Sequence, residues 1–273
     1  MSRWLLPGLL AVLALLSAVS LLAGTVWFTP ADALAALRNP HGDLLQLVIT
    51  EVRLPRLALA ILVGAILGLS GAVLQGLLRN PLAEPGLLGV SSGASLGAVI
   101  ALYYGFAAAF TLATPLFALV GALSTISVAL LLSRTGGTLS LILTGVAVST
   151  IAGAGLSLAL NLAPNPYAAY EIMTWLMGSL NDRSWDHVLL ATPFILAGGF
   201  LLFLTAPALD ALTLGERQAE SLGVDLKRLR LLALLGTALG VGAATAVTGT
   251  ILFVGLISPH LVRPLVRHQP GAV

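Results

Sequence analysis

Charged residues are scarce in this chain. They make up 9% of its 273 residues, whereas 58% are hydrophobic and the mean hydropathy is +1.02. Because soluble domains carry about a quarter charged residues, the composition excludes a soluble globular protein and indicates a polytopic protein of the lipid bilayer. Cysteine is absent, which excludes disulfides and thiolate metal sites. The net charge of +2, without a basic stripe interleaved with aromatic residues, gives no indication of nucleic-acid binding.

Lysine occurs only once, at Lys227, and this excludes an ATPase. A P-loop needs a lysine directly after its second glycine, whereas Lys227 follows Leu226. The chain is therefore not an ATP-hydrolysing enzyme, and a partner must hydrolyse any ATP that drives it. None of the 11 acidic residues lies in the middle of a hydrophobic segment, which disfavours an ion-coupled secondary transporter. Coupling through backbone carbonyl groups alone stays open.

The hydrophobic segments predict an all-α fold with about eight transmembrane helices. About 20 apolar residues cross the hydrocarbon core, and the expected segments are 5–27, 57–78, 88–105, 110–132, 138–161, 188–206, 230–248 and 251–267. The first resembles a secretory signal, but its apolar run exceeds the roughly 7–15 residues of a cleaved one, so we expect an uncleaved helix. Nine Lys and Arg residues on one side against four on the other predict a cytoplasmic N-terminus.

A short Gly-x-Ser-Gly sequence at 68–71 offers one catalytic alternative. It would make Ser70 the nucleophile of an intramembrane protease, with His260 as the base. So short a match in a chain rich in glycine and serine favours helix packing instead. Glycines spaced four apart predict the same close packing at 64/68, 89/93/97 and 236/240.

Residues 207–229 form the main polar loop, expected on the cytoplasmic side. Gly215 and Gly223 predict the ends of two short helical pieces, and the 216–222 piece is too short to be stable alone in water. Its partly apolar face consists of Ala219, Leu222 and Val224. This face predicts a protein partner, whereas a purely solvated loop is the alternative.

Arg53 and Arg56 stand at the start of the second hydrophobic segment, expected on the outer side. They have two interpretations: anchoring at the membrane interface, or docking of carboxylates on a soluble partner. The same segment ends in a Pro/Gly-rich elbow at 79–89. Backbone breaks at membrane depth are tolerated where they line protein or water, so the elbow is a candidate part of a transport path.

Collinear motifs between Arg53 and Arg263 resemble the FecCD-type permease family of ABC importers, which serve ferric siderophores, haem and cobalamin. The matching segments are RLPR at 53–56, RNPLAEPGLLGVSSGASLGA at 79–98, LILTGVAVS at 141–149, WLMGSL at 175–180, LGERQAESLGV at 214–224 and GTILFVGLISPHLVR at 249–263.

The resemblance implies one transmembrane permease domain over 1–273, with 207–229 as its cytoplasmic coupling loop, in a multi-pass protein of the cell inner membrane. It implies a second permease subunit (a second copy or a paralogue), two cytoplasmic ATP-binding subunits and a periplasmic substrate-binding protein. No cofactor and no resident metal are expected.

The resemblance also assigns roles to residues. Docking of the binding protein falls on Arg53 and Arg56. ATPase coupling falls on Leu214, Gly215, Glu216, Ala219, Leu222 and Gly223. The gate and path fall on Asn80, Pro81, Leu82, Gln75, Ser91, Ser92, Gly93 and Thr138.

The family's pattern is a ten-helix subunit, with two more helices after SPHLVR. We therefore expect this chain to be truncated at its C-terminal end relative to the family. The motifs do not distinguish substrates; an iron chelate (a siderophore or haem) is the expectation, with cobalamin as the other choice.

Overall fold

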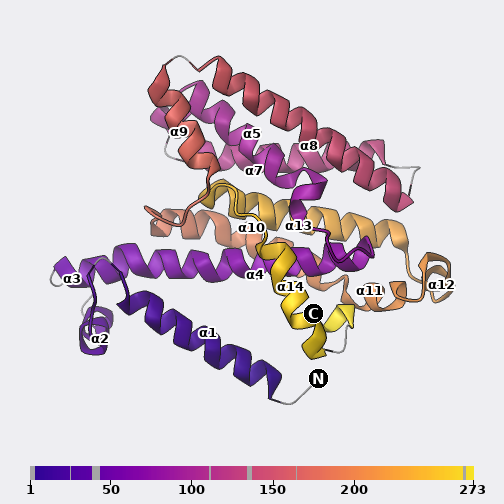
Figure 1. The fold of residues 1–273 in the computed structure, drawn as a ribbon, viewed down its shortest axis with the longest axis horizontal. Coiled ribbons are helices and arrows are strands. Elements are labelled where there is room, and N and C mark those ends of the chain that lie inside the picture. The colour runs from indigo at the N-terminus through magenta and orange to yellow at the C-terminus, as the bar shows by residue number, and fades with distance from the viewer. Residues whose placement is uncertain are drawn as a thin grey trace.

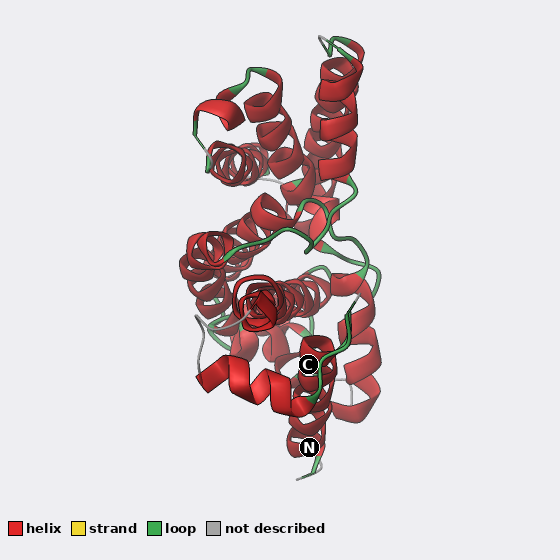
Figure 2. Cartoon of the chain, turned by 90° about the vertical axis from the view of Figure 1, so that its left-hand side faces the viewer, coloured by secondary structure: helices red, strands yellow, loops and turns green. Residues whose placement is uncertain are grey.

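The computed structural model describes residues 4–24, 26–38, 44–110, 112–133, 137–163, 165–266 and 269–273, and these residues form helices and loops without a strand (Figure 2). The principal helices are α1 (Leu5–Leu22), α4 (Leu54–Leu77), α5 (Val90–Tyr103), α7 (Ala113–Leu132), α8 (Gly137–Asn161), α10 (Trp185–Phe203), α13 (Leu226–Thr248) and α14 (Val254–Val262). The shorter ones are α2 (Pro30–Arg38), α3 (Leu44–Leu47), α6 (Phe106–Ala109), α9 (Pro166–Leu176), α11 (Ala206–Leu212) and α12 (Glu216–Ser221).

The expected all-α membrane fold is confirmed, and six helices are long and apolar enough to span a bilayer. These are Leu5–Leu22, Val48–Leu77, Ala113–Leu132, Leu139–Asn161, Trp185–Leu212 and Leu226–Thr248. The other two expected segments contain the shorter apolar helices Val90–Tyr103 and Val254–Val266. The expected start at 251 is wrong, because residues 249–253 are not helical and α14 begins only at Val254.

Two short helices lie between the long apolar segments: α2 follows α1, and α9 precedes α10. The side chain of Asn165 caps α9 by accepting a hydrogen bond from the Ala168 amide at 2.9 Å. Gly178 has φ +70°, a left-handed conformation that an α-helix cannot continue through, which is why α9 ends just before it, at Leu176.

Helix α13 occupies the centre of the bundle. It packs against α4, α5, α7 and α10, and most of its residues are buried. By contrast, α1 has no buried residue and lies along the edge of the bundle (Figure 1). Figure 1 also shows the two ends used below: α11 and α12 lie at one end, the α12 end, whereas α2, α3 and α9 lie at the other, the α9 end.

Glycine permits the closest helix contacts, as the spacing predicts, but not at every position. A Cβ added to Gly97 would lie 2.0 Å from the Phe117 carbonyl oxygen, and one added to Gly236 would lie 2.8 Å from that of Gly198. These contacts join α5 to α7 and α13 to α10 through backbone. Gly64 differs, because nothing lies within 4 Å of its added Cβ.

Candidate functional site

The polar elbow after α4 is folded by its own backbone and side chains. Arg79 has φ +47°, and the Asn80 amide donates to the Gln75 carbonyl oxygen at 3.2 Å. The Asn80 side-chain oxygen accepts from the Leu82 amide at 2.9 Å, forming an Asx turn. The Leu82 side chain is 69% exposed. The elbow therefore fixes Asn80 while it leaves Leu82 free to meet another surface.

Gln75 connects this elbow with α14. Its side chain is buried; its amide nitrogen donates to the Leu256 carbonyl oxygen at 3.3 Å, and its amide oxygen accepts from Arg263 at 2.5 Å. A cavity of about 270 Å³ opens beside this pair and is lined by Ala72, Gln75, Gly76, Arg79, Asn80, Pro81, Thr213, Arg263, Pro270 and Val273. Three of the predicted path residues, Gln75, Asn80 and Pro81, thus share one recess with two arginines at the α12 end.

Arg263 belongs to this recess although the sequence analysis gave it no role beyond its charge. Arg263 bonds Gln75 although the two residues are 188 positions apart in the sequence. No local pattern signals such a contact, because it depends on how α14 crosses α4. A Cβ added to Gly71 would lie 1.8 Å from the Gly255 carbonyl oxygen, so glycine sets that crossing.

A second polar junction forms where the chain breaks between α13 and α14. Gly249 has φ +71°, and the Ser179 amide donates to the Thr248 carbonyl oxygen at 2.6 Å. The hydroxyls of Ser95 and Thr250 are 2.9 Å apart. The Ser179–Thr248 bond satisfies irregular backbone between apolar helices, and such backbone is tolerated at membrane depth where it is buried in protein or lines a watery cavity.

The remaining predicted path residues lie in different surroundings. Ser91 is buried one turn before Ser95 on the same face of α5, and Ser92 is half-buried. Gly93 faces α7, since an added Cβ would lie 1.8 Å from the Thr125 hydroxyl oxygen, so it serves helix contact. Thr138 lies in the first turn of α8, and its side chain lies outside the described residues.

The 207–229 loop folds as a helix–turn–helix that is only partly docked on the bundle. Gly215 has φ +109° and Gly223 has φ +87°, and they bracket α12 as predicted. Ala219 is fully buried, however, which corrects its expected place on an outward apolar face. The outward leucines are Leu214, 61% exposed, and Leu222, 65% exposed.

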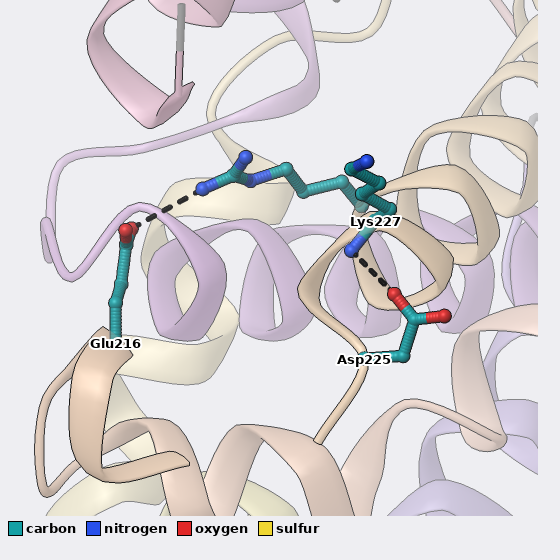
Figure 3. Close-up of polar contacts among 4 residues, drawn as sticks. Glu216, Asp225 and Lys227 are labelled. Atoms are coloured by element: carbon teal, nitrogen blue, oxygen red, sulfur yellow. Dashed lines mark hydrogen bonds and ion pairs between the residues drawn. The ribbon is translucent and has the colours of Figure 1, made fainter. Parts of the chain in front are cut away.

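Ionic and capping contacts hold α12 against the start of α13. A guanidinium nitrogen of Arg230 lies 3.4 Å from the Glu216 carboxylate. The Asp225 carboxylate caps α13 by accepting from the amides of Lys227 and Arg228 at 2.9 and 3.1 Å. Figure 3 shows Glu216 reaching across from α12 and Asp225 at the foot of α13.

Arg53 and Arg56, at the α9 end, differ in their surroundings. The Arg53 side chain is 8% exposed, and it donates to the Leu21 and Val26 carbonyl oxygens at 2.6 and 2.5 Å. Its guanidinium lies 4.1 Å from the centroid of the Phe28 ring. This inward position does not favour docking through Arg53. Arg56 is half-buried, and no described group bonds its Nε.

The α9 end also carries an open cavity of about 460 Å³. It is lined by Tyr170, Glu171, Thr174, Trp175, Ser179, Asn181, Asp182 and Arg183. Burial lowers the pKa of the Arg183 guanidinium, and the Asp182 carboxylate partly opposes that effect. The cavity thus has both charge signs on its wall.

The protease alternative gains no support from the geometry. The Ser70 side chain is fully buried, and no described group, His260 included, bonds its hydroxyl. His260 is exposed at the surface of α14. Within the described ranges, no group of three or more His, Asp or Glu side chains is placed to hold a metal ion.

Comparison with known families identifies the fold. The model of the FecCD transport family matches residues 10–273. The chain belongs to the FecCD transport family. This confirms the resemblance seen in the motifs and makes the chain an ABC transporter permease by family.

The sequences of individual relatives support this family assignment. It is 42% identical over 226 residues to an uncharacterized ABC transporter permease protein, YvrB of Bacillus subtilis, covering 80% of this chain and 63% of that one. It is 38% identical to the hemin transport system permease protein HmuU of Yersinia pestis (93% of this chain, 76% of that one). It is 39% identical to the vitamin B12 import system permease protein BtuC of Vibrio vulnificus (96% and 77%).

A solved structure shows the same fold. It is described as an inward-facing conformation of an ABC transporter of the metal-chelate type. The sequences are 33% identical, and the TM-score is 0.86, with 97% of this chain and 82% of that one covered. The FecCD permease therefore spans about three-quarters of several relatives and less than two-thirds of YvrB.

Proposed function

We propose that this FecCD permease is the membrane subunit of an ATP-driven importer that moves an iron chelate, a siderophore or haem, into the cytoplasm. The relatives named for hemin, for vitamin B12 and for metal chelates support this substrate range. Cobalamin is the alternative substrate. The second permease subunit, the two ATP-binding subunits and the periplasmic binding protein are parts of the same proposal.

The observation that carries the proposal is the half-docked α12. Its buried Ala219 fixes it to the bundle, while Leu214 and Leu222, which flank it, are exposed. Two exposed leucines at the ends of a short helix, at a polar end of a membrane protein, favour a protein partner. We assign that partner as the ATP-binding subunit, which makes the α12 end cytoplasmic, in agreement with the Lys and Arg bias.

At the opposite end, the proposed binding-protein contact rests on Arg56. Arg53 donates its hydrogen bonds to backbone carbonyl groups, so it stabilises the surface of the α9 end and its guanidinium does not face a partner. The recess around Gln75, Asn80 and Arg263 is then the cytoplasmic end of the path, and the Ser95–Thr250 pair lies along it.

A co-purification experiment tests the coupling assignment. Leu214→Ser and Leu222→Ser should each weaken retention of the co-expressed ATP-binding subunit about tenfold, since burying a leucine contributes about 1.5–3 kcal/mol. Ser221→Ala is the control, because Ser221 is exposed at the end of α12, next to Leu222, and its hydroxyl bonds the Arg217 carbonyl oxygen. Undiminished retention by both leucine variants would refute the assignment.

An uptake experiment identifies the substrate. The permease, its ATP-binding subunit and its binding protein are reconstituted in vesicles and offered haem, a ferric siderophore and cobalamin separately. Uptake of an iron chelate alone supports the proposal. Uptake of cobalamin alone would replace the substrate, and uptake of none with an intact complex would contradict the importer assignment.

A further inference from the structure

Helix α4 is preceded by a π-helical turn, Val48–Arg53, and the two form one continuous apolar span. At the end of this turn the Leu54 amide donates to the Ile49 carbonyl oxygen, five residues back instead of four. Pro55 explains the change, because a proline ring clashes with the carbonyl group four residues earlier, here that of Glu51. The π turn therefore accommodates the proline by taking in one extra residue.

The extra residue changes which side chains of this segment are buried. On α4 the buried positions Pro55, Leu59 and Val63 recur every four residues. An unbroken α-helix would continue this row to Glu51. Instead Thr50 is buried, with 7% of its surface exposed, and Glu51 is exposed. The π turn thus keeps a carboxylate out of the bundle.

The Thr50 carbonyl group is the point at which this turn needs outside support. Its π-helical donor would come from position 55, which is a proline and has no N–H. The indole N–H of Trp185 donates to this carbonyl oxygen at 2.9 Å, although the two residues are 135 positions apart. Trp185 is the first residue of α10, and the Ser184 amide caps that helix start by donating to His187 Nδ1 at 3.3 Å. A fixed helix end thereby replaces the hydrogen bond that proline removes.

We propose that Trp185 is a positioning residue for docking of the binding protein, a role that rests on the proposed function. Trp185 stabilises the π turn, and the turn holds Glu51 outward and Arg53 inward onto the end of α1. Without the extra residue, segment 48–53 would rotate by about 100° relative to α4. Glu51 would then enter the buried face and Thr50 would leave it. A partner that recognises charges at the α9 end would meet a different pattern.

Thiol labelling of the full chain in detergent tests the turn without transport activity, because the sequence has no cysteine of its own. Thr50→Cys and Glu51→Cys are labelled separately with a soluble maleimide. Trp185→Phe keeps an aromatic ring but removes the N–H. It should speed labelling of Thr50→Cys about fivefold, the factor that corresponds to one ordinary hydrogen bond, and slow labelling of Glu51→Cys. Trp27→Phe is the matched control, since Trp27 is 75% exposed in the segment before α2, and it should change neither rate.

Faster labelling at both positions would indicate general loosening and would overturn the proposal. Pro55→Ala reaches the same state by a second route, because it restores an N–H and removes the ring. It should exchange the two labelling rates by itself, and Trp185→Phe should add nothing to it. Additive effects would show that Trp185 acts independently of the π turn, which would also overturn the proposal.

Docking is measured as association of the purified binding protein with the assembled transporter. Trp185→Phe should lower the association rate about fivefold, in step with the labelling, while retention of the ATP-binding subunit stays unchanged. An unchanged association rate despite exchanged labelling would overturn the docking role of Trp185. If the binding protein does not associate with the unaltered permease either, the proposed function fails, whereas the labelling result still stands for the turn.

Discussion

Gly71 is the residue on which the crossing of α4 and α14 depends. Its added Cβ would lie 1.8 Å from the Gly255 carbonyl oxygen, a distance that no side chain can occupy. The crossing in turn brings Arg263 to Gln75 and shapes the recess at the α12 end. A single missing methyl group thus supports both packing and the candidate path.

We expect Gly71→Ala to lower the free energy of unfolding by about 1–3 kcal/mol, the range for overpacked interiors. The matched control is Gly64→Ala in the same helix, where nothing lies within 4 Å of the added Cβ. That change should be neutral or slightly stabilising, because alanine favours a helix. Midpoints of thermal unfolding in detergent compare them, and equal midpoints would contradict the close crossing.

At the scale of elements, α1 joins the bundle through few contacts. Arg53 provides hydrogen bonds to the end of α1 and to the segment that follows it. Its guanidinium bonds two carbonyl oxygens where the chain leaves α1 and covers the ring of Phe28. Hydrogen bonds from a charged group are worth about 1.5–3 kcal/mol each. Arg53 is therefore expected to fix the orientation of α1.

Arg53→Ala should increase amide hydrogen exchange over residues 21–28 by at least tenfold, because both carbonyl oxygens lose their donor. Arg56→Ala, a loss of the same charge one helical turn away, should leave that exchange unchanged but weaken docking of the binding protein. If the two variants exchanged their effects, the roles assigned to the two arginines would be reversed.

The break between α13 and α14 is a second element with a defined test. Gly249→Ala adds a Cβ 2.2 Å from the Trp175 carbonyl oxygen and also forces alanine into φ +71°. Gly105→Ala is the control, since Gly105 has φ +74° but nothing within 4 Å. The control should lower the free energy of unfolding by about 1–2 kcal/mol through backbone strain alone. Gly249→Ala should lower it by clearly more, because its Cβ also meets backbone. Equal decreases in the midpoints of thermal unfolding would show that the backbone between α13 and α14 shifts to accommodate the added methyl group.

Over the whole molecule, the proposed ATP-binding subunit is the expected source of energy for transport. Acidic residues are absent from the middle of the predicted spans, so a proton or sodium ion has no side-chain carboxylate there to occupy. We expect substrate uptake by the assembled transporter to stop when the ATP-binding subunit is inactivated and to persist with an uncoupler. The opposite pattern would establish an ion-coupled carrier.

The sequence predicted the helices better than their contacts. The charge-free run at 57–78 located α4 within three residues of its start, because apolar length alone defines a spanning helix. It could not show that Ala219 faces inward, that Arg53 turns back onto the 21–28 segment, or that Gly249 packs against the Trp175 carbonyl oxygen. Each of these depends on a neighbour distant in the chain.

The glycine seams have a further consequence. Where α5 meets α7, and α4 meets α14, glycine brings the two backbones together, and the side chains that meet these glycines include the small Thr125 and Ser258. Such contacts have few large side chains to disengage when one helix slides along another. We therefore expect relative movement of these helices to meet little resistance, so the residues that make the bundle tight are also those that let it change shape.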